Sequence, residues 1–162
     1  MDEVDLIVSA WERERPDLDV TPMAVLSRVS RLARQLDLAR KETFAAHGLE
    51  VWAFDVLSAL RRAGEPYQLS PSTLVNEMMV TSGTMTNRID RLVSRGLVSR
   101  HPDPTDRRGV HVRLTASGRT KVDTALAELL EHEHELLSNL SQAQKRKLAE
   151  LLRSLSTGFS PT

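Results

Sequence analysis

The 162-residue sequence has no cysteine, a single tyrosine and few aromatic residues of any kind, which make up 4% of the chain. Without cysteine the chain cannot form a disulfide, sense oxidants through a thiol or bind a metal through thiolates. The sequence also lacks an apolar run of membrane-spanning length and a basic segment followed by an apolar one near its start. We therefore expect a soluble cytoplasmic protein with no membrane partner.

The usual signs of an enzyme are missing as well. The five histidines are scattered, and no nucleophile lies in a recognisable elbow or beside a basic partner. A glycine-rich phosphate loop is likewise absent. We therefore expect no catalytic residues and no cofactor.

Charge is unevenly distributed along the chain, although the formal net charge is zero. Residues 70–113 hold seven arginines against four acidic residues, a surplus of three positive charges. A local basic surface is what contacts phosphate groups, so a neutral total does not exclude nucleic acid as a partner.

Residues 70–95 have the pattern of a helix-turn-helix. Ser70-Pro71 suits the start of a short helix, and Thr81-Ser82-Gly83 suits a turn with a second cap. The second helix has a predicted buried stripe made of Met85, Ile89 and Leu92. Its other side carries polar residues that can read base edges or contact phosphate, and we assign DNA binding to Ser82, Thr84, Thr86, Asn87 and Arg91. From this helix alone, an ordinary solvated face is an equal alternative.

A predicted β-hairpin follows directly. Leu97–His101 and Val110–Leu114 read as strands, and the turn residues between them include Arg107 and Arg108. Arginines at such a tip can reach a minor groove or nearby phosphates, and we include both among the DNA contacts. Residues 67–69 can add a third short strand. The whole order of elements predicts a winged helix-turn-helix and favours DNA over a solvated face.

Residues 83–119, which read GTMTNRIDRLVSRGLVSRHPDPTDRRGVHVRLTASGR, resemble the recognition helix and wing of the MarR family of bacterial transcriptional regulators. In that family an Asp-x-Arg pattern lies in the wing and a Leu-Thr-x-x-Gly run starts the next helix. Here they read Asp106-Arg107-Arg108 and Leu114-Thr115-Ala116-Ser117-Gly118. The resemblance extends over nearly the whole chain and implies a regulator of transcription, by default a repressor, that binds a double-stranded DNA operator.

Amphipathic helices are predicted at both ends of the chain, over 2–13, 21–46, 115–137 and from 141 onward, with Thr21 as the cap before Pro22. These helices have more apolar surface than one small winged domain can cover, which predicts a homodimer on a pseudo-palindromic operator. MarR relatives dimerise through such helices. We expect a mainly α (α+β) fold forming one domain over 1–162, with a dimerisation region at 1–48 and 115–162 and a DNA-binding lobe at 49–114.

Four further residues are candidates for a ligand site: Trp11, Asp55, Arg88 and Arg100, the last near the end of the first wing strand. Spacing alone predicts that Asp55 and Arg88 form a structural ion pair and that Trp11 is a packing residue. The urate-responsive branch of the MarR family, however, has an added N-terminal helix with a Trp, and an Asp and two Arg in matching places. The resemblance thus implies a small anionic effector, urate or a related purine, that releases DNA. Relatives that respond to tricarboxylates such as trans-aconitate have a similar site, so that alternative stays open.

Other readings remain for the same sequence. His132 and His134 invite a zinc-responsive sensor, but residues two apart on a helix point to different faces, and we expect no metal site. A ligand-independent DNA-binding or architectural protein has the same fold. A winged module that binds protein also fits, since a fold does not determine its function.

Overall fold

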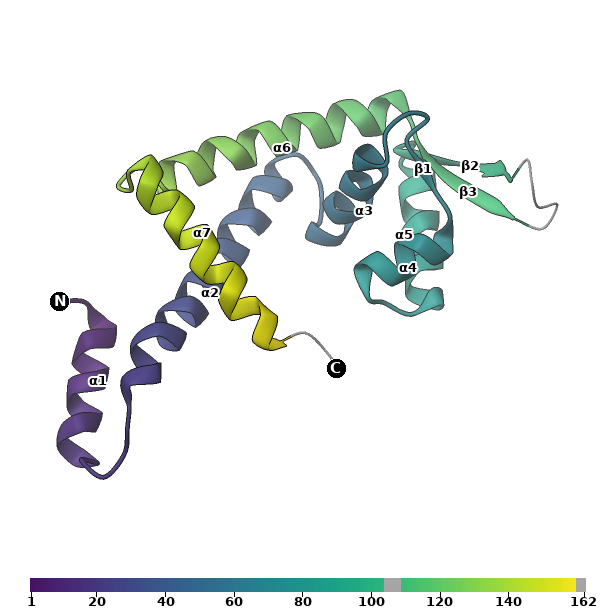
Figure 1. The fold of residues 1–162 in the computed structure, drawn as a ribbon. Coiled ribbons are helices and arrows are strands. Elements are labelled where there is room, and N and C mark those ends of the chain that lie inside the picture. The colour runs from purple at the N-terminus through teal and green to yellow at the C-terminus, as the bar shows by residue number, and fades with distance from the viewer. Residues whose placement is uncertain (104–108, 160–162) are drawn as a thin grey trace. The chain divides into compact units, whose positions relative to one another are not determined.

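The computed structural model describes residues 1–103 and 109–159. Helices predominate, and three short strands form one sheet (Figure 1). This confirms the predicted fold class. The chain divides into two compact units, Met1–Asp55 and Val56–Thr162. The boundary falls inside a helix, so the predicted division into a dimerisation region and a DNA-binding lobe stays a prediction.

The first unit contains helices α1 (Glu3–Glu14) and α2 (Thr21–Ala46) and the beginning of α3 (Val51–Arg62). Helix α1 starts with a capping box in which Asp2 and Asp5 each accept the backbone N–H of the other. Arg28 of α2 donates to both of these carboxylates, at 2.9 and 2.6 Å, and Arg31 donates to Glu3 at 2.5 Å. These bonds fasten α1 to α2, together with the buried side chain of Val4.

The predicted cap of α2 is wrong by one residue. Thr21 is already helical, and Val20 precedes the helix without a side-chain capping bond. The cause is Asp19, whose carboxylate accepts both the backbone N–H of Thr21 at 3.0 Å and its hydroxyl at 2.7 Å. Asp19 therefore accepts the first free N–H of the helix, that of Thr21, and occupies the hydroxyl that we expected to act as the cap. Pro22 still lies in the first turn, where no N–H is needed.

The second unit continues α3 and contains β1 (Gln68–Leu69), α4 (Pro71–Met78), α5 (Ser82–Ser94), β2 (Val98–Pro102) and β3 (Val110–Leu114). The strands form an antiparallel sheet in the order β1-β3-β2, with Val98 opposite Leu114 and Gln68 opposite Arg113. The predicted short strand does therefore join the wing. Ser70 and Thr81 cap α4 and α5 as expected, since each side chain accepts an N–H from the first helical turn.

Two more helices follow, α6 (Ala116–Leu136) and α7 (Gln142–Ser156), and then the 3-10 turn η1 (Thr157–Phe159). Thr115 joins the wing to α6 without a linker. Its side chain caps α6, its hydroxyl donates to the Gly96 carbonyl at 2.7 Å, and its N–H donates to the Leu97 carbonyl at 3.1 Å. A Cβ on Gly118 would lie 2.0 Å from that Leu97 oxygen, so the first turn of α6 packs directly on backbone.

The buried core is concentrated in α3, α5 and the wing strands. The predicted stripe of α5 is buried, and so are Ala53, Val56 and Leu60 of α3. In β3, Val112 and Leu114 are buried, whereas Val110 is exposed. By contrast, no residue of α7 is buried, and many leucines of α2, α6 and α7 are exposed. In the described part of the chain, no helix combines the length and the apolar character needed to cross a membrane.

Candidate functional site

Helix α5 presents a polar surface opposite its buried side. Met85, Ile89 and Leu92 are buried, and the helical period therefore turns the opposite residues outward. All five residues of α5 predicted to contact DNA are exposed: Ser82, Thr84, Thr86, Asn87 and Arg91. The side chains that the sequence placed together on one face do lie on the exposed side of one helix.

The hydrogen bonds of this surface show which groups are available to a partner. The Thr86 hydroxyl donates to the Ser82 carbonyl at 2.9 Å, and Thr84 shares a hydroxyl bond of 2.9 Å with Thr81. Within the described residues the Asn87 amide makes no hydrogen bond, so its donor and acceptor are both available. An asparagine amide can pair with an adenine edge in a major groove.

The wing strands β2 and β3 are described up to Asp103 and from Gly109 onward. Arg107 and Arg108, the predicted wing contacts, lie outside the described residues. At the base of the hairpin the N–H of Asp103 donates to the Gly109 carbonyl at 2.9 Å. The Asp103 carboxylate lies 3.4 Å from Nε2 of His111, and this side-chain contact links the two strands next to the turn.

Arg100 lies in the middle of β2, not near its end as the sequence predicted. Its guanidinium donates to the carboxylate of Asp90 on α5. This bond joins α5 to the wing.

The other three predicted effector residues belong to different units. Trp11 of α1 and Asp55 of α3 lie in the first unit, whereas Arg88 of α5 lies in the second with Arg100. Trp11 is 47% exposed, and Arg88 is half-buried at the edge of the apolar side of α5. Their assembly into one ligand site stays a prediction.

Asp55 has a partner that the sequence analysis missed. Arg40 of α2 donates to its carboxylate at 3.3 Å, and the Arg40 guanidinium lies 5.6 Å from the centroid of the Phe44 ring. The spacing of four between Arg40 and Phe44 places both on one side of a helix and was a usable signal for that contact. The contact with Asp55 crosses the turn at Gly48 and has no signature in the spacing.

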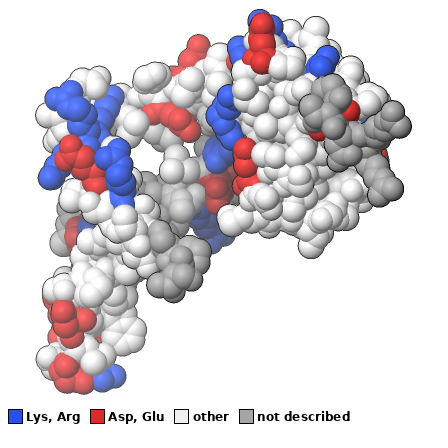
Figure 2. All heavy atoms as spheres, turned by 45° about the vertical axis from the view of Figure 1, so that its right-hand side comes forward, with Lys and Arg blue, Asp and Glu red and all other residues white. Residues whose placement is uncertain are grey.

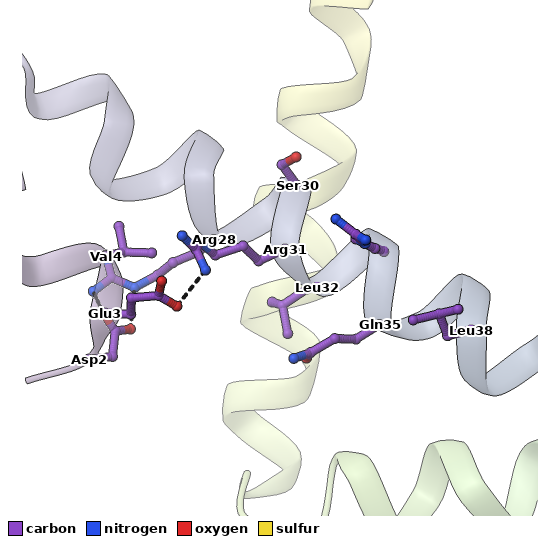
Figure 3. A pocket seen from close by; sticks show the side chains of 10 residues that line it. Asp2, Glu3, Val4, Arg28, Ser30, Arg31, Leu32, Gln35 and Leu38 are labelled. Carbon is purple, nitrogen blue, oxygen red and sulfur yellow. Dashed lines mark hydrogen bonds and ion pairs between the residues drawn. The ribbon is translucent and has the colours of Figure 1, made fainter. Parts of the chain in front are cut away.

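A cavity of about 740 Å³ lies between α1 and α2 (Figure 3). Asp2, Glu3, Arg28 and Arg31 lie at one end, and Leu32, Gln35 and Leu38 extend it along α2. Hydrogen bonds from backbone N–H groups, and then from the Arg28 guanidinium, hold the pKa of the Asp2 and Asp5 carboxyls below the ordinary value. None of the four predicted effector residues lines this cavity. Its acidic groups are paired with Arg28 and Arg31.

Charged side chains on the displayed face form small groups of mixed sign separated by uncharged areas (Figure 2). Among residues 1–103 and 109–159, no group of three or more histidine and acidic side chains is arranged to hold a metal ion.

Comparison with known proteins places the site in context. A sequence model of the MarR family matches residues 47–109, from the end of α2 to the start of β3. The HTH-type transcriptional regulator PecS of Dickeya dadantii is 41% identical over 150 residues, which cover 93% of this chain and 90% of PecS. The multiple antibiotic resistance protein MarR of Escherichia coli is 34% identical over 103 residues, covering 63% of this chain and 69% of MarR.

Solved structures agree with this picture. A mutant MarR from E. coli complexed with operator DNA has a TM-score of 0.67 and 29% identity, and the match covers 85% of this chain and 99% of that one. AbsC, a MarR family transcriptional regulator from Streptomyces coelicolor, has a TM-score of 0.76 at 19% identity, covering 88% and 96%. At that identity AbsC supports the fold alone.

Proposed function

The chain belongs to the MarR family of transcriptional regulators, and from this membership we propose that it binds a pseudo-palindromic operator as a homodimer and releases it when a small anionic metabolite binds. DNA-binding regulation of transcription is the activity of the family. The operator, the dimer and the effector are the parts that we propose for this chain.

The exposed polar side of α5 is the observation that supports DNA binding. It is capped at its N-terminus, anchored by three buried apolar residues, and presents Asn87 and Arg91 outward. Asparagine and arginine are the side chains that read adenine and guanine edges, while the threonines near the start of the helix suit phosphate. Arg107 and Arg108 of the wing supply additional positive charge.

Exposed leucines support the homodimer. Ten of them lie on α2, α6 and α7: Leu26, Leu32, Leu36, Leu38, Leu126, Leu130, Leu136, Leu148, Leu151 and Leu152. Leaving this much apolar surface in water is unfavourable, and a second copy can bury it. A two-fold dimer then presents two recognition helices to half-sites about 34 Å apart.

The effector proposal rests on Trp11, Asp55, Arg88 and Arg100. A flat anion can stack on the indole of Trp11 and be held by guanidinium groups, which match oxyanions with two parallel hydrogen bonds. Negative charge brought near Asp55 repels its carboxylate and alters the contacts of α3. Urate is the first candidate, because the added N-terminal helix and these four residues match the urate-responsive branch of the family.

Release of DNA requires that the effector bind the DNA-incompetent form more tightly than the DNA-bound form. A tenfold drop in operator affinity corresponds to a preference of about 1.4 kcal/mol. This preference makes the effector measurable by its influence on DNA binding, whatever pose it adopts in the site.

The test is a gel-shift titration on the intergenic DNA upstream of the protein's own gene, without effector, with urate and with trans-aconitate. We expect binding at low salt that weakens steeply with added salt, because phosphate contacts release counterions. Release by one of the two compounds identifies the effector class. Absence of binding at low salt contradicts the assignment of α5 as a recognition helix.

Two substitutions test the effector residues. Asp55→Ala and Arg88→Ala should each leave a folded protein that binds DNA but no longer responds to the effector. If both variants keep the wild-type response, the Asp55 and Arg88 roles are structural. Release by zinc in place of either anion supports the sensor alternative, and indifference to all three supports a ligand-independent DNA-binding protein.

A further inference from the structure

Arg40 holds Asp55 by a contact that leaves most of its hydrogen-bonding capacity unused. The single bond from Nη2 to the Asp55 carboxylate is 3.3 Å long, with both side chains more than a third exposed. Charge-assisted bonds between a guanidinium and a carboxylate are ordinarily about 2.7 to 2.9 Å and often come in parallel pairs. Asp55 therefore binds the guanidinium weakly, through a single hydrogen bond.

The remaining donors of Arg40 include one that is buried without an acceptor. Its Nε is buried and makes no hydrogen bond within the described residues. A buried N–H without a partner is unfavourable, and native structures rarely retain one without a reason. The free-energy cost of the unpaired Nε–H is removed if an acceptor with two oxygens binds the guanidinium along its Nε edge.

Aromatic side chains hold the guanidinium in position. It lies 5.6 Å from the Phe44 ring, within the range of a cation–π contact. Phe44 is buried and stacks on Phe54, with ring centroids 3.9 Å apart and an interplanar angle of 13°. Arg40 is thus placed on a rigid base, and little side-chain freedom is lost when an anion binds to it.

We infer that Arg40 is a further anion-binding residue of the effector site, and that the effector's oxyanion replaces the Asp55 carboxylate on the Arg40 guanidinium. The inference rests on the proposed function and deepens it. It limits the effector to anions that present two acceptors side by side, as a carboxylate or a deprotonated cyclic imide does. It also gives the response a physical first step, since the displaced Asp55 belongs to α3, the helix that leads into the winged lobe.

The experiment compares Arg40→Gln with Arg34→Gln, an exposed arginine on the same helix. Binding of urate and of trans-aconitate is measured by calorimetry in the absence of DNA, and operator affinity is measured without effector. Arg40→Gln should weaken binding of the active compound by at least about tenfold, because a bidentate charge-assisted contact is lost. Arg34→Gln should bind both the effector and DNA as the wild type does. Arg40→Gln frees Asp55 and should therefore have a lowered operator affinity without effector.

Arg40→Lys tests whether the effector needs the paired donors of the guanidinium or only its positive charge. It also tests the role of Arg40 if Arg40→Gln does not fold. A lysine keeps the positive charge but not the paired donors, so the affinity should fall by about threefold or more. Asp55→Asn should bind the effector at least as tightly as the wild type while releasing DNA less readily, because the competing carboxylate is gone.

The outcomes distinguish this inference from the proposed function. A wild-type protein that binds neither compound contradicts the proposed effector class and the inference with it. A wild type that binds one of them, with Arg40→Gln and Arg40→Lys at the same affinity, overturns the role of Arg40 alone. Loss of binding in Arg34→Gln to the same extent also overturns it, because the effect would then be one of general charge.

Discussion

Arg100 on β2 and Asp90 on α5 are joined by a hydrogen bond of 2.5 Å, so the wing and the recognition helix hold each other in place. Arg100 is also one of the four proposed effector residues. Its guanidinium is therefore already engaged by a carboxylate, and an anionic effector has to compete with Asp90 for it. Both side chains are substantially exposed, at 41% and 57%, which makes the pair weak enough for such competition.

Asp90→Asn should increase effector affinity, because it removes the competing charge. An exposed ion pair contributes about 0.2 to 1 kcal/mol, which corresponds to an effector affinity about 1.4-fold to fivefold higher. Calorimetry without DNA measures this change. Glu77→Gln is the matched control, since it removes one negative charge from α4, where Glu77 lies 3.6 Å from Arg62. Equal affinities in the wild type and Asp90→Asn would show that Arg100 does not bind the effector.

Gly118→Ala should destabilise the protein by about 2 to 3 kcal/mol, the upper part of the range for overpacking. The added Cβ would lie 2.0 Å from the backbone oxygen of Leu97, an atom that no rotamer change can move away. Urea unfolding followed by circular dichroism gives the free energy of unfolding. Gly83→Ala provides the comparison, because no atom lies within 4 Å of its added Cβ. Gly83→Ala should be neutral or stabilising, and an equal loss in both variants would refute the close-packing argument.

Acid should release α1 from α2. The pKa values of Asp2 and Asp5 are lowered in the folded state, so their contribution to stability is present above the unfolded value of 3.8 and is lost as the pH falls through the lowered values. Trp11 fluorescence in a Trp52→Phe background, recorded from pH 6 to pH 2, follows α1 directly.

Arg28→Gln should move this transition to higher pH, because the guanidinium contributes to the lowered pKa of both carboxyls. Arg15→Gln serves as a control, since Arg15 pairs with Asp17 in the segment between the two helices. A transition with the same midpoint in Arg28→Gln and the wild type would mean that these pairs do not fasten α1.

Leu151→Asp combined with Leu152→Asp should convert the proposed dimer to a monomer, because each would bury a charge in the apolar interface that we propose. Both leucines are exposed on α7, which has no buried residue of its own. Light scattering after size exclusion measures the mass, and operator affinity should fall by about tenfold or more when only one half-site is held at a time. Met79→Asp changes an exposed apolar residue in the turn after α4 and should remain dimeric. An unchanged mass in the double variant would exclude α7 from the interface.

Local sequence signals predicted most of the fold. Ser70, Thr81 and Thr115 mark helix starts through contacts over three residues, and the structure shows each of them. The buried stripe of α5 followed from its helical period. The cap of α2 was misassigned because the Asp19 carboxylate binds both the N–H and the hydroxyl of Thr21, which already lies in the first helical turn. The sequence pattern does not show that the Thr21 hydroxyl is engaged in this way.

The candidate site was less accessible to sequence reasoning. The exposed face of α5 followed from its period, but the partners of Asp55 and Arg100 did not. Asp55 meets Arg40, and Arg100 meets Asp90, across turns whose geometry no spacing rule supplies. Ion pairs between separate elements depend on how those elements pack, so spacing proposed Arg88 as the partner of Asp55 and gave no sign of Arg40. The assignment of these charged residues to an effector site stays a prediction.

The direct connection of β3 to α6 through Thr115 couples the direction of the strand to the direction of the helix. Because β3 passes into this helix through one capping residue, any change in the direction of the strand is transmitted to all 21 residues of α6. At 1.5 Å per residue the helix is about 31 Å long, so a tilt of about 5° at the joint displaces its far end by about 3 Å. A tilt of that size at the joint would move Leu136 by roughly the diameter of a water molecule.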